Sequence, residues 1–394
     1  NRCNVYLNNA AKGTDISAGD GELHVYADTF TVIDPDYYYM YSDSSGYAVN
    51  DISWDINAGK ITQTDQNLFV SPNGDNSNSG LSPDEALRNI SYALLKMRSD
   101  TITPDTIHIA NGYYSPSTGE KFPLSLKAEV SLIGEFRDSV ILDGEDSIYI
   151  LHGINNAHNY SIKNMSIQHG NGDKHSVYGR GVFTFFENKG VTIENVVFKE
   201  NTGSINSCGH IGNSNGFRVL NSVFEDNVGG EALRLIYARP EKQHDSIQVI
   251  ACKFSNNQPD YSIPSSDGGG GGASSVLGHE ASQDPGLLFV HYTNCLFTNN
   301  HTRNHPYGGM SSVSTVFSRQ SGGLISNCTF GDNSSDNTMG ANIGITSNAE
   351  VSIYNSVLYS NNPAELYMYT YEGNSYLNIY NSCVQGGLLG IKSY

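Results

Sequence analysis

Residues 191–201 read VTIENVVFKEN, and this short stretch decides the fold. Apolar residues alternate up to Phe198, with Asn195 three places before it and Asn201 three places after it. Alternation with a period of two is typical of a β-strand, because successive side chains of a strand point to opposite faces. The stretch therefore predicts a strand that carries a buried apolar anchor and has polar turn residues on either side.

The same pattern recurs along the chain at intervals of 31, 26, 30, 43, 33, 28 and 26 residues. The apolar anchors are Ile167, Phe198, Phe224, Phe254, Phe297, Phe330, Leu358 and Val384. Repeats of this length are the sequence signature of a solenoid, in which each coil buries its apolar face only when it stacks on its neighbours. We predict an all-β chain folded as a right-handed parallel β-helix, with these anchors in its interior.

Two polar positions accompany the anchors. Three places before them stand Asn164, Asn195, Asn221, Asn294, Asn327, Asn355 and Asn381, with Ala251 in the remaining coil. In coils stacked about 4.8 Å apart, these amides are expected to bond to one another along the stack. Three places after the anchors stand Gly170, Asn201, Asn227, Asn257, Asn300, Asn333, Asn361 and Gly387. We expect the left-handed corner of each coil at this second position, because glycine and asparagine tolerate that conformation.

The cysteines follow the repeat as well. Cys252, Cys295 and Cys328 each stand two places before an anchor, on the inward side of the strand. No CxxC pair occurs among the six cysteines, which argues against a zinc site. Stacked thiols meet the distance for a disulfide but not easily its dihedral angle, so we expect buried free thiols.

The repeat sets the domain boundaries. We predict a parallel β-helix over residues 67–394 and a β-rich extension over residues 1–66. Ser82 begins the sequence SPDE, which resembles a capping box and predicts a short capping helix at about 82–98 over the N-terminal end of the stack. The long interval between Phe254 and Phe297 contains a glycine run, which predicts an inserted loop at about 258–287.

Composition excludes several partners. The chain has 22 Lys plus Arg against 40 Asp plus Glu, a formal net charge of −18, so nucleic acid is not expected as a ligand. No apolar run reaches about 18 residues, so no membrane insertion is expected.

Residues 68–75 (LFVSPNGD), the expected capping helix and residues 106–114 (TIHIANGYY) together resemble the opening of pectate-lyase-like β-helix proteins. The resemblance covers roughly residues 67–394. It implies a secreted protein, extracellular or on a cell surface. It specifies the fold more than the activity, since this superfamily includes lyases, hydrolases, epimerases, adhesins and phage spikes.

Two groups of residues are candidates for chemistry. Glu231, Arg234 and Arg239 offer a carboxylate and a base, although a solvated ion pair explains them equally simply. His279, Glu280, His301 and His305 offer metal-binding side chains, although histidines of polar loops usually bind no metal. The paired aspartates of polygalacturonase-type hydrolases are absent from the sequence. No cofactor is expected, with calcium a ligand only if the chain is a lyase.

Two classes of function stay open. The first is an extracellular β-solenoid with a structural, filament-forming or adhesive role, which self-associates end to end or stacks on neighbouring β-helix units and binds polysaccharide. The last coil supports it, because no capping helix follows it in the sequence. The alternative is a polysaccharide lyase or glycoside hydrolase that acts on an acidic glycan in a groove along the β-helix.

Overall fold

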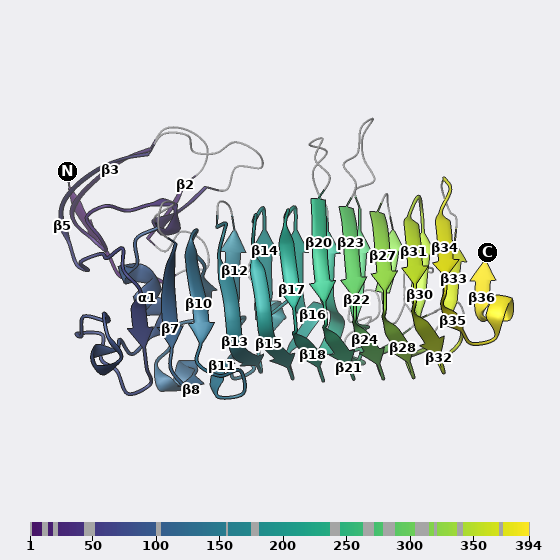
Figure 1. The fold of residues 1–394 in the computed structure, drawn as a ribbon. Helices are drawn as coiled ribbons and strands as arrows, with labels where there is room; N and C mark the ends of the chain where they lie inside the picture. Colours follow the sequence, from purple (N-terminus) through teal and green to yellow (C-terminus); the bar gives the residue numbers. More distant parts are fainter. Residues whose placement is uncertain are drawn as a thin grey trace.

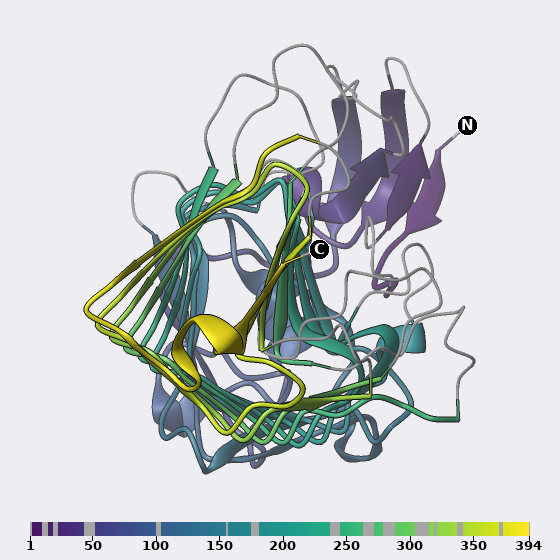
Figure 2. The same ribbon diagram turned by 90° about the vertical axis from the view of Figure 1, so that its right-hand side faces the viewer.

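The computed structural model describes most of the chain. The residues outside the description are 1, 10–14, 19–22, 43–51, 100–103, 155–156, 175–180, 237–244, 263–271, 279–287, 304–314, 319–320, 337–341, 370–372 and 394. The described residues form a right-handed parallel β-helix of about 11 turns, which confirms the predicted fold class (Figure 1). The coils have a three-sided cross-section when viewed along the stack (Figure 2).

Two long parallel sheets run the length of the stack. A complete coil gives two strands to the 19-stranded sheet and one to the 10-stranded sheet. The 19-stranded sheet contains β6 (Leu68–Val70), β7 (Asp105–Ile109), β8 (Gly112–Tyr114), β10 (Val130–Gly134), β11 (Val140–Asp143), β13 (Ser161–Gln168), β15 (Thr192–Lys199), β17 (Phe217–Leu220), β18 (Val223–Glu225), β20 (Asp245–Ile250), β21 (Lys253–Ser255), β23 (Leu288–Thr293), β24 (Leu296–Thr298), β27 (Ser321–Ser326), β28 (Thr329–Gly331), β31 (Glu350–Tyr354), β32 (Val357–Tyr359), β34 (Tyr376–Tyr380) and β35 (Cys383–Val384). The 10-stranded sheet contains β9 (Leu124–Ser125), β12 (Leu151–Ile154), β14 (Phe183–Phe186), β16 (Thr202–Gly212), β19 (Val228–Ile236), β22 (Ser274–Leu277), β26 (Thr315–Ser318), β30 (Ile343–Thr346), β33 (Leu366–Tyr369) and β36 (Ile391–Ser393).

Shorter elements complete the fold. Two small strands, β25 (His301–Thr302) and β29 (Ser334–Ser335), pair with each other between the long sheets. The remaining strands are β1 (Cys3–Val5), β2 (Ile16–Ala18), β3 (Leu23–Phe30), β4 (Met40–Ser42) and β5 (Ile52–Gly59). The helices are α1 (Ile90–Lys96) and the 3-10 turns η1 (Tyr37–Tyr39), η2 (Pro83–Glu85), η3 (Pro116–Thr118), η4 (Gly172–Lys174) and η6 (Gly387–Gly390).

The apolar anchors stack in one file. The register pairs Ile167 with Phe198 and then Phe224, Phe254, Phe297, Phe330, Leu358 and Val384 in turn. The rings of Phe198, Phe224, Phe254, Phe297 and Phe330 stack with centroids 4.6 to 4.9 Å apart. Burial of such rings supplies most of the driving force for stacking the coils.

Of the left-handed corners predicted three places after the anchors, only that at Gly387, with a φ of 56°, is confirmed, and Gly170 has no positive φ. The residues three places before the anchors, from Asn164 to Asn381, all have positive φ, between 48° and 57°. A second corner lies two places after the anchor, at Glu200, Asp226, Asn256, Asn299, Asp332 and Ser360. The prediction of corners at Asn201, Asn227, Asn257, Asn300, Asn333 and Asn361 is wrong, since none of these residues has a positive φ. Asparagine suits the first corner because its short amide lowers the cost of the left-handed conformation.

The main amide ladder lies three places after the anchor. Asn201 donates to Asn227, Asn227 to Asn257, Asn257 to Asn300, Asn300 to Asn333 and Asn333 to Asn361, with Nδ2 to Oδ1 distances of 2.9 to 3.1 Å. The expected ladder of Asn164, Asn195, Asn221, Asn294, Asn327, Asn355 and Asn381 is reduced, among the described residues, to one bond from Asn195 to Asn164. These asparagines are partly or fully exposed, so water can bond to their side-chain amides and bonds between the amides are not required.

The cysteines on the repeat are buried. Cys252, Cys295 and Cys328 are free thiols inside the stack, and Cys208 is a fourth buried thiol. The Cys295 main-chain N–H donates to Cys328 Sγ at 3.4 Å. These side chains therefore pack as small apolar groups.

A cap covers the N-terminal end of the stack (Figure 1). Within the region 82–98, residues 83–85 form η2 and Ile90–Lys96 form α1. Ile90, Ala93 and Leu94 of α1 lie in the core cluster that continues through the coils. The Ser82 side chain makes no capping bond, so the capping-box interpretation of SPDE is wrong.

The N-terminal extension is also built from parallel strands. The strands β1, β3 and β5 form a three-stranded sheet, and β2 pairs with β4. This small sheet lies beside the capped end of the β-helix (Figures 1 and 2). Tyr39 joins it to the cap, because its hydroxyl donates to the Leu95 carbonyl at 2.6 Å.

The insertion in the long coil is only partly described. Residues 258–287 were expected to form one loop, but β22 lies inside this range and pairs with β19 and β26 in the 10-stranded sheet. The prediction of a continuous loop is therefore wrong at residues 274–277, because these residues supply the third strand of their coil.

None of the described helices is long and apolar enough to cross a membrane.

Candidate functional site

A row of polar side chains crosses the outer face of the 10-stranded sheet. The strand register pairs His152, Thr184, His210, Arg234 and Ser275 across β12, β14, β16, β19 and β22. Their chain neighbours, such as Phe183 and Leu235, belong to the core, so these five residues point away from it. We call them the outer row. Its charged groups are an arginine and, when protonated, two histidines.

The outer row is shielded from solvent although it faces outward. His152, Thr184, His210 and Ser275 are at most 3% exposed, and Arg234 is partly buried. Ser318 on β26 and Thr346 on β30 lie on the same outer face, since each follows an inward residue of the core, and both are buried. Ligand groups held on this face would thus contact polar side chains in a largely dry environment.

Four polar atoms of this face have no partner among the residues that the structure describes. They are Arg234 Nε, Ser275 Oγ, Ser318 Oγ and Thr346 Oγ1, all buried. Buried polar groups are nearly always hydrogen-bonded, because leaving one unpaired costs about 1–3 kcal/mol. Several hydrogen-bonding atoms on this one face therefore remain unused among the described residues.

The predicted group Glu231, Arg234 and Arg239 is only partly brought together. Glu231 and Arg234 both lie on β19, and no ion pair joins them in the described structure. Arg239 lies outside the described residues. The simple explanation of a surface ion pair thus does not account for Glu231 and Arg234.

A hydrogen-bonded cluster surrounds His301, the first residue of β25, which directly follows the ladder residue Asn300. The His301 ring contacts Tyr261 Oη at 2.9 Å and Asp336 Oδ1 at 3.1 Å through Nε2, and Ser334 Oγ at 2.8 Å through Nδ1. The Tyr261 hydroxyl donates to Asp336 Oδ2 at 2.8 Å. Burial and the adjacent Asp336 raise the pKa of Tyr261 to about 12, so this phenol stays protonated at neutral pH.

The candidate metal site lies almost wholly outside the described residues, so it stays untested. Of its four members, only His301 is described, while His279, Glu280 and His305 lie outside the description. Within the part of the chain that is described, no group of three or more His, Cys, Asp or Glu side chains could hold a metal ion. His301 instead bonds to Tyr261, Ser334 and Asp336.

A second imidazole lies between two carboxylates near the N-terminal end. His169 Nδ1 lies 2.7 Å from Asp143 Oδ2, and His169 Nε2 lies 3.2 Å from Glu200 Oε2. The bond to Asp143 raises the pKa of His169. Burial opposes ionisation of Asp143, but hydrogen bonds from Tyr113, His169 and Gln168 outweigh it and hold the pKa of Asp143 below its usual value.

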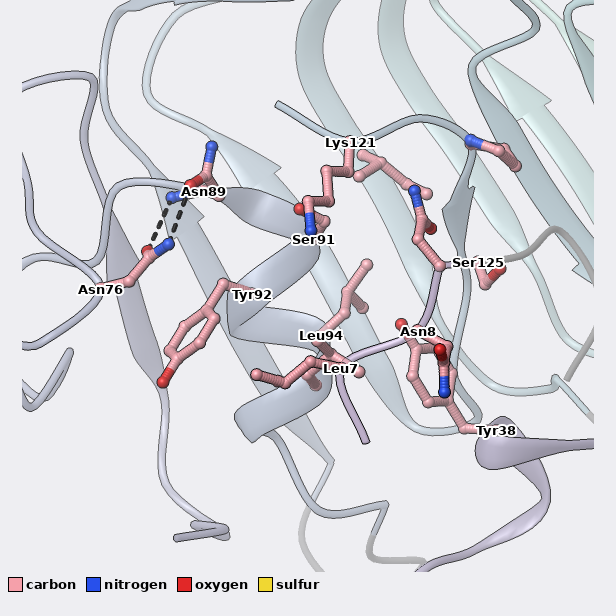
Figure 3. Close-up of a pocket in the computed structure, with 14 residues that line it drawn as sticks. Leu7, Asn8, Tyr38, Asn76, Asn89, Ser91, Tyr92, Leu94, Lys121 and Ser125 are labelled. Atoms are coloured by element: carbon pink, nitrogen blue, oxygen red, sulfur yellow. Dashed lines mark hydrogen bonds between the residues drawn. The ribbon is translucent and has the colours of Figure 1, made fainter. Parts of the chain in front are cut away.

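A small cavity separates the extension from the cap (Figure 3). It has a volume of about 140 Å³ and lies between Leu7 and Asn8 of the extension, Tyr92 of α1 and Lys121. The Asn76 and Asn89 side chains close one side through a bond of 2.9 Å. Its walls are mainly leucine, tyrosine and proline, and its charged lining residue is Lys121, so it is a packing defect at a junction more than a site for chemistry.

Ser334, Asp336 and the unpaired hydroxyls of the 10-stranded sheet were not predicted from the sequence. For Ser334, the position within the repeat could have indicated its neighbour. His301 and Ser334 each directly follow a ladder asparagine, so their coils place them side by side. The hydroxyls had no such signal, because the strands of the 10-stranded sheet lack the regular sequence pattern that marks the anchors.

The chain resembles known proteins only distantly. Residues 72–247 match a family described as a protein of unknown function, DUF1565. No curated protein matches the chain. Similar solved structures include pectate lyase Pel9A, at 13% identity and a TM-score of 0.43, with 82% of this chain and 79% of that chain covered. A rhamnogalacturonan lyase has 13% identity and a TM-score of 0.45, with coverage of 77% and 72%. The surface adhesin PfbA of Streptococcus pneumoniae has 12% identity and a TM-score of 0.37, with coverage of 70% and 83%.

These likenesses are too distant to carry an argument about activity, substrate or assembly. The coils themselves confirm the resemblance to pectate-lyase-like β-helix proteins as one of fold. Function must be argued from the side chains on the coils.

Proposed function

We propose that this chain is an extracellular β-helix that binds an acidic polysaccharide along the outer face of its 10-stranded sheet. The supporting observation is the set of buried polar atoms without partners on that face, at Arg234, Ser275, Ser318 and Thr346. Arg234 and Ser275 are register partners on β19 and β22, and Ser318 and Thr346 follow on β26 and β30, two residues further along their strands. A linear polymer along the stack would pass over all four side chains, whose unpaired atoms are shielded from solvent in this structure.

The chemistry of the face suits a glycan with carboxylates. Arg234 makes no ion pair among the described residues, and guanidinium pairs well with a carboxylate. The Ser275, Ser318 and Thr346 hydroxyls can both donate to and accept from sugar hydroxyls. Tyr261, which bonds to His301 and Asp336, is 63% exposed and offers an aromatic surface on which a sugar ring can rest.

The net charge of −18 makes this proposal selective. An acidic polymer is repelled at long range and gains only where it meets Arg234. Moderate salt screens the long-range repulsion more than the partly buried contact, so binding should tolerate salt better than a purely surface attraction would.

Binding to polygalacturonate and to neutral dextran tests the proposal by isothermal titration calorimetry. We expect binding to polygalacturonate alone, weakened about tenfold by Arg234→Gln, since a charged hydrogen bond contributes about 1.5–3 kcal/mol. The control is Arg218→Gln, which removes an exposed arginine of β17 on the other sheet. Equal binding by both variants would contradict the proposal, as would equal binding to dextran.

The same titration addresses the enzymatic alternative. Glu231 and Arg234 share β19 and are not bonded to each other, so a carboxylate and a base are both available to a bound glycan. A lyase would produce an unsaturated sugar that absorbs in the ultraviolet, with calcium as a ligand of the substrate carboxylate. An absorbance that rises with time for the wild-type chain, but not for Arg234→Gln, would indicate that this face cleaves the glycan and does not merely bind it.

End-to-end self-association is a second proposal, supported by a different observation. Leu388 and Leu389 of η6 are 87% and 91% exposed, an unusual amount of bare apolar surface at one place. A second copy of the chain, placed against η6, would cover them. Sedimentation velocity should show concentration-dependent association that Leu388→Asp with Leu389→Asp abolishes, and wild-type protein that stays monomeric would contradict this role. Secretion belongs to the first proposal and is tested by locating the protein in cell and medium fractions.

A further inference from the structure

Two consecutive coils bring a serine, a histidine and an aspartate side by side. Ser334 Oγ lies 2.8 Å from His301 Nδ1, and His301 Nε2 lies 3.1 Å from Asp336 Oδ1. Ser334 and Asp336 belong to the turn around β29, and His301 begins β25 on the preceding coil. The β25–β29 pairing fixes His301 directly beside Ser334, so their contact follows from the backbone register.

The protonation states in this chain are consistent with one another. The Tyr261 hydroxyl oxygen lies 2.9 Å from His301 Nε2 and is its hydrogen-bond partner, and Asp336 Oδ1 lies 3.1 Å from the same nitrogen. In neutral His301 the proton therefore lies on Nε2, where it faces this oxygen and the carboxylate beside it. His301 Nδ1 then accepts from the Ser334 hydroxyl. The Tyr261 hydroxyl donates to the other oxygen of Asp336 at 2.8 Å and holds the carboxylate in place. The serine hydroxyl thus already points its proton at a base.

We propose that Ser334 is the nucleophile of an acyl-ester hydrolase site, with His301 as its general base and Asp336 as the group that orients His301. The arrangement of nucleophile, base and orienting carboxylate defines this chemistry on unrelated folds, whatever the order of the residues in the chain. The substrate class is a small acyl ester, such as an O-acetyl group on the glycan of the proposed function. Only the identity of this ester rests on that proposed function.

The reaction balances with water as the second reactant. Ser334 Oγ forms a bond to the acyl carbon while its proton moves to His301 Nδ1, and the ester C–O bond then breaks as His301 returns the proton to the leaving sugar oxygen. Water next attacks the acyl carbon while one of its protons moves to His301 Nδ1. The bond between the acyl carbon and Ser334 Oγ then breaks as His301 returns this proton to Oγ, which releases the carboxylic acid and restores the Ser334 hydroxyl. No metal or redox partner takes part in these steps.

The neighbouring backbone sets the expected rate. The main-chain N–H groups of Ser334, Ser335 and Asp336 all bond to carbonyls of adjacent coils at 2.9 to 3.0 Å. They are therefore not free to stabilise an oxyanion, and a single missing donor costs about 10²–10³ in rate. Turnover should be slow, so covalent capture of Ser334 is a more sensitive readout than hydrolysis.

A fluorophosphonate probe tests the proposal on the full chain by intact-mass and peptide mass spectrometry. We expect one adduct, on Ser334, which Ser334→Ala abolishes and both His301→Gln and Asp336→Asn slow at least tenfold. The matched control is Ser204→Ala, because the Ser204 hydroxyl, in β16 of another coil, donates to the carboxylate of Asp173 at 2.6 Å. Its labelling should equal that of the wild-type chain.

Hydrolysis of p-nitrophenyl acetate gives a second readout, with melting temperatures to show that each variant is folded. A folded wild-type chain with no adduct would overturn the proposal, as would an adduct that persists in Ser334→Ala. Neither outcome affects glycan binding through Arg234, since the probe contains no sugar. Conversely, a wild-type chain that binds no polygalacturonate but is still labelled on Ser334 would leave the ester site standing alone.

Discussion

The Asn227 side chain donates to Asn257 Oδ1 at 2.9 Å, and the Asn227 main-chain N–H contacts the same oxygen at 3.3 Å. Asn227 Nδ2 also donates to the carbonyl of Phe198, the anchor of the preceding coil, at 3.1 Å. One buried amide thus bonds to the coils on both sides of it. This arrangement recurs from Asn201 to Asn333 and makes the ladder the polar counterpart of the stacked phenylalanines.

Replacing one ladder amide should cost more than one hydrogen bond. Asn257→Ala removes the acceptor for Asn227 and the donors to Asn300 and Phe224, all inside the stack. Because buried groups are left unpaired, we expect a loss of about 3 kcal/mol in the free energy of unfolding, measured by urea denaturation. Asn378→Ala, on the partly exposed β34 with a bond of 3.5 Å, is the control and should change stability little. Equal losses of unfolding free energy in the two variants would show that a buried ladder amide stabilises the fold no more than a partly exposed one.

Ala251 is the weak point of the first corner. It adopts φ of 54°, the conformation that asparagine adopts in the neighbouring coils, and its side chain is exposed. A left-handed conformation costs an alanine roughly 1 kcal/mol, and asparagine or glycine less. We expect Ala251→Asn to raise the melting temperature and Asn294→Ala, its mirror on the next coil, to lower it. A melting temperature that falls in Ala251→Asn would refute the conformational argument.

Much of the fold could be predicted from the residues 191–201 and their repeats, because anchors such as Phe198 have to stack if they are buried at all. The two asparagine columns could not be told apart, since the sequence gives identity but not exposure. A buried amide needs partners, whereas an exposed one at positive φ needs none, and only the coordinates show that Asn227 is inside and Asn221 outside.

The candidate site was less predictable for a related reason. Ser334 and His301 are 33 residues apart and become neighbours only through the register of β25 and β29. The anchors fix that register, so His301 and Ser334 could have been placed side by side. The unpaired hydroxyl of Ser318 could not have been predicted, because Ser318 lies in the 10-stranded sheet, where the sequence pattern is irregular.

The thiols should divide sharply by reactivity. Cys3 and Cys383 are exposed, whereas Cys208, Cys252, Cys295 and Cys328 are buried. Burial raises the pKa of the Cys208 thiol, and alkylation requires the thiolate. We therefore expect iodoacetamide to modify only the two exposed cysteines in the native protein at pH 8 and all six in urea, as counted by intact mass. Modification of the buried four without urea would show that the stack opens readily.

The His169 cluster predicts how stability depends on pH. The pKa of His169 is raised by Asp143, so the stabilisation from its charge is fully present below the ordinary histidine pKa and is lost as pH rises through the raised value. The pKa of Asp143 is lowered, so its contribution is present above the ordinary aspartate pKa and is lost as pH falls through the lowered value. Both contributions coexist in mildly acidic solution. His169→Gln should therefore remove part of the fall in unfolding free energy between pH 6 and pH 9, by less than about 1 kcal/mol because the imidazole is partly exposed. His158→Gln, which removes a histidine 3.7 Å from Glu129, serves as the comparison. A wild-type profile that is flat over this range, or an identical fall in the His169→Gln variant, would rule out the cluster as its source.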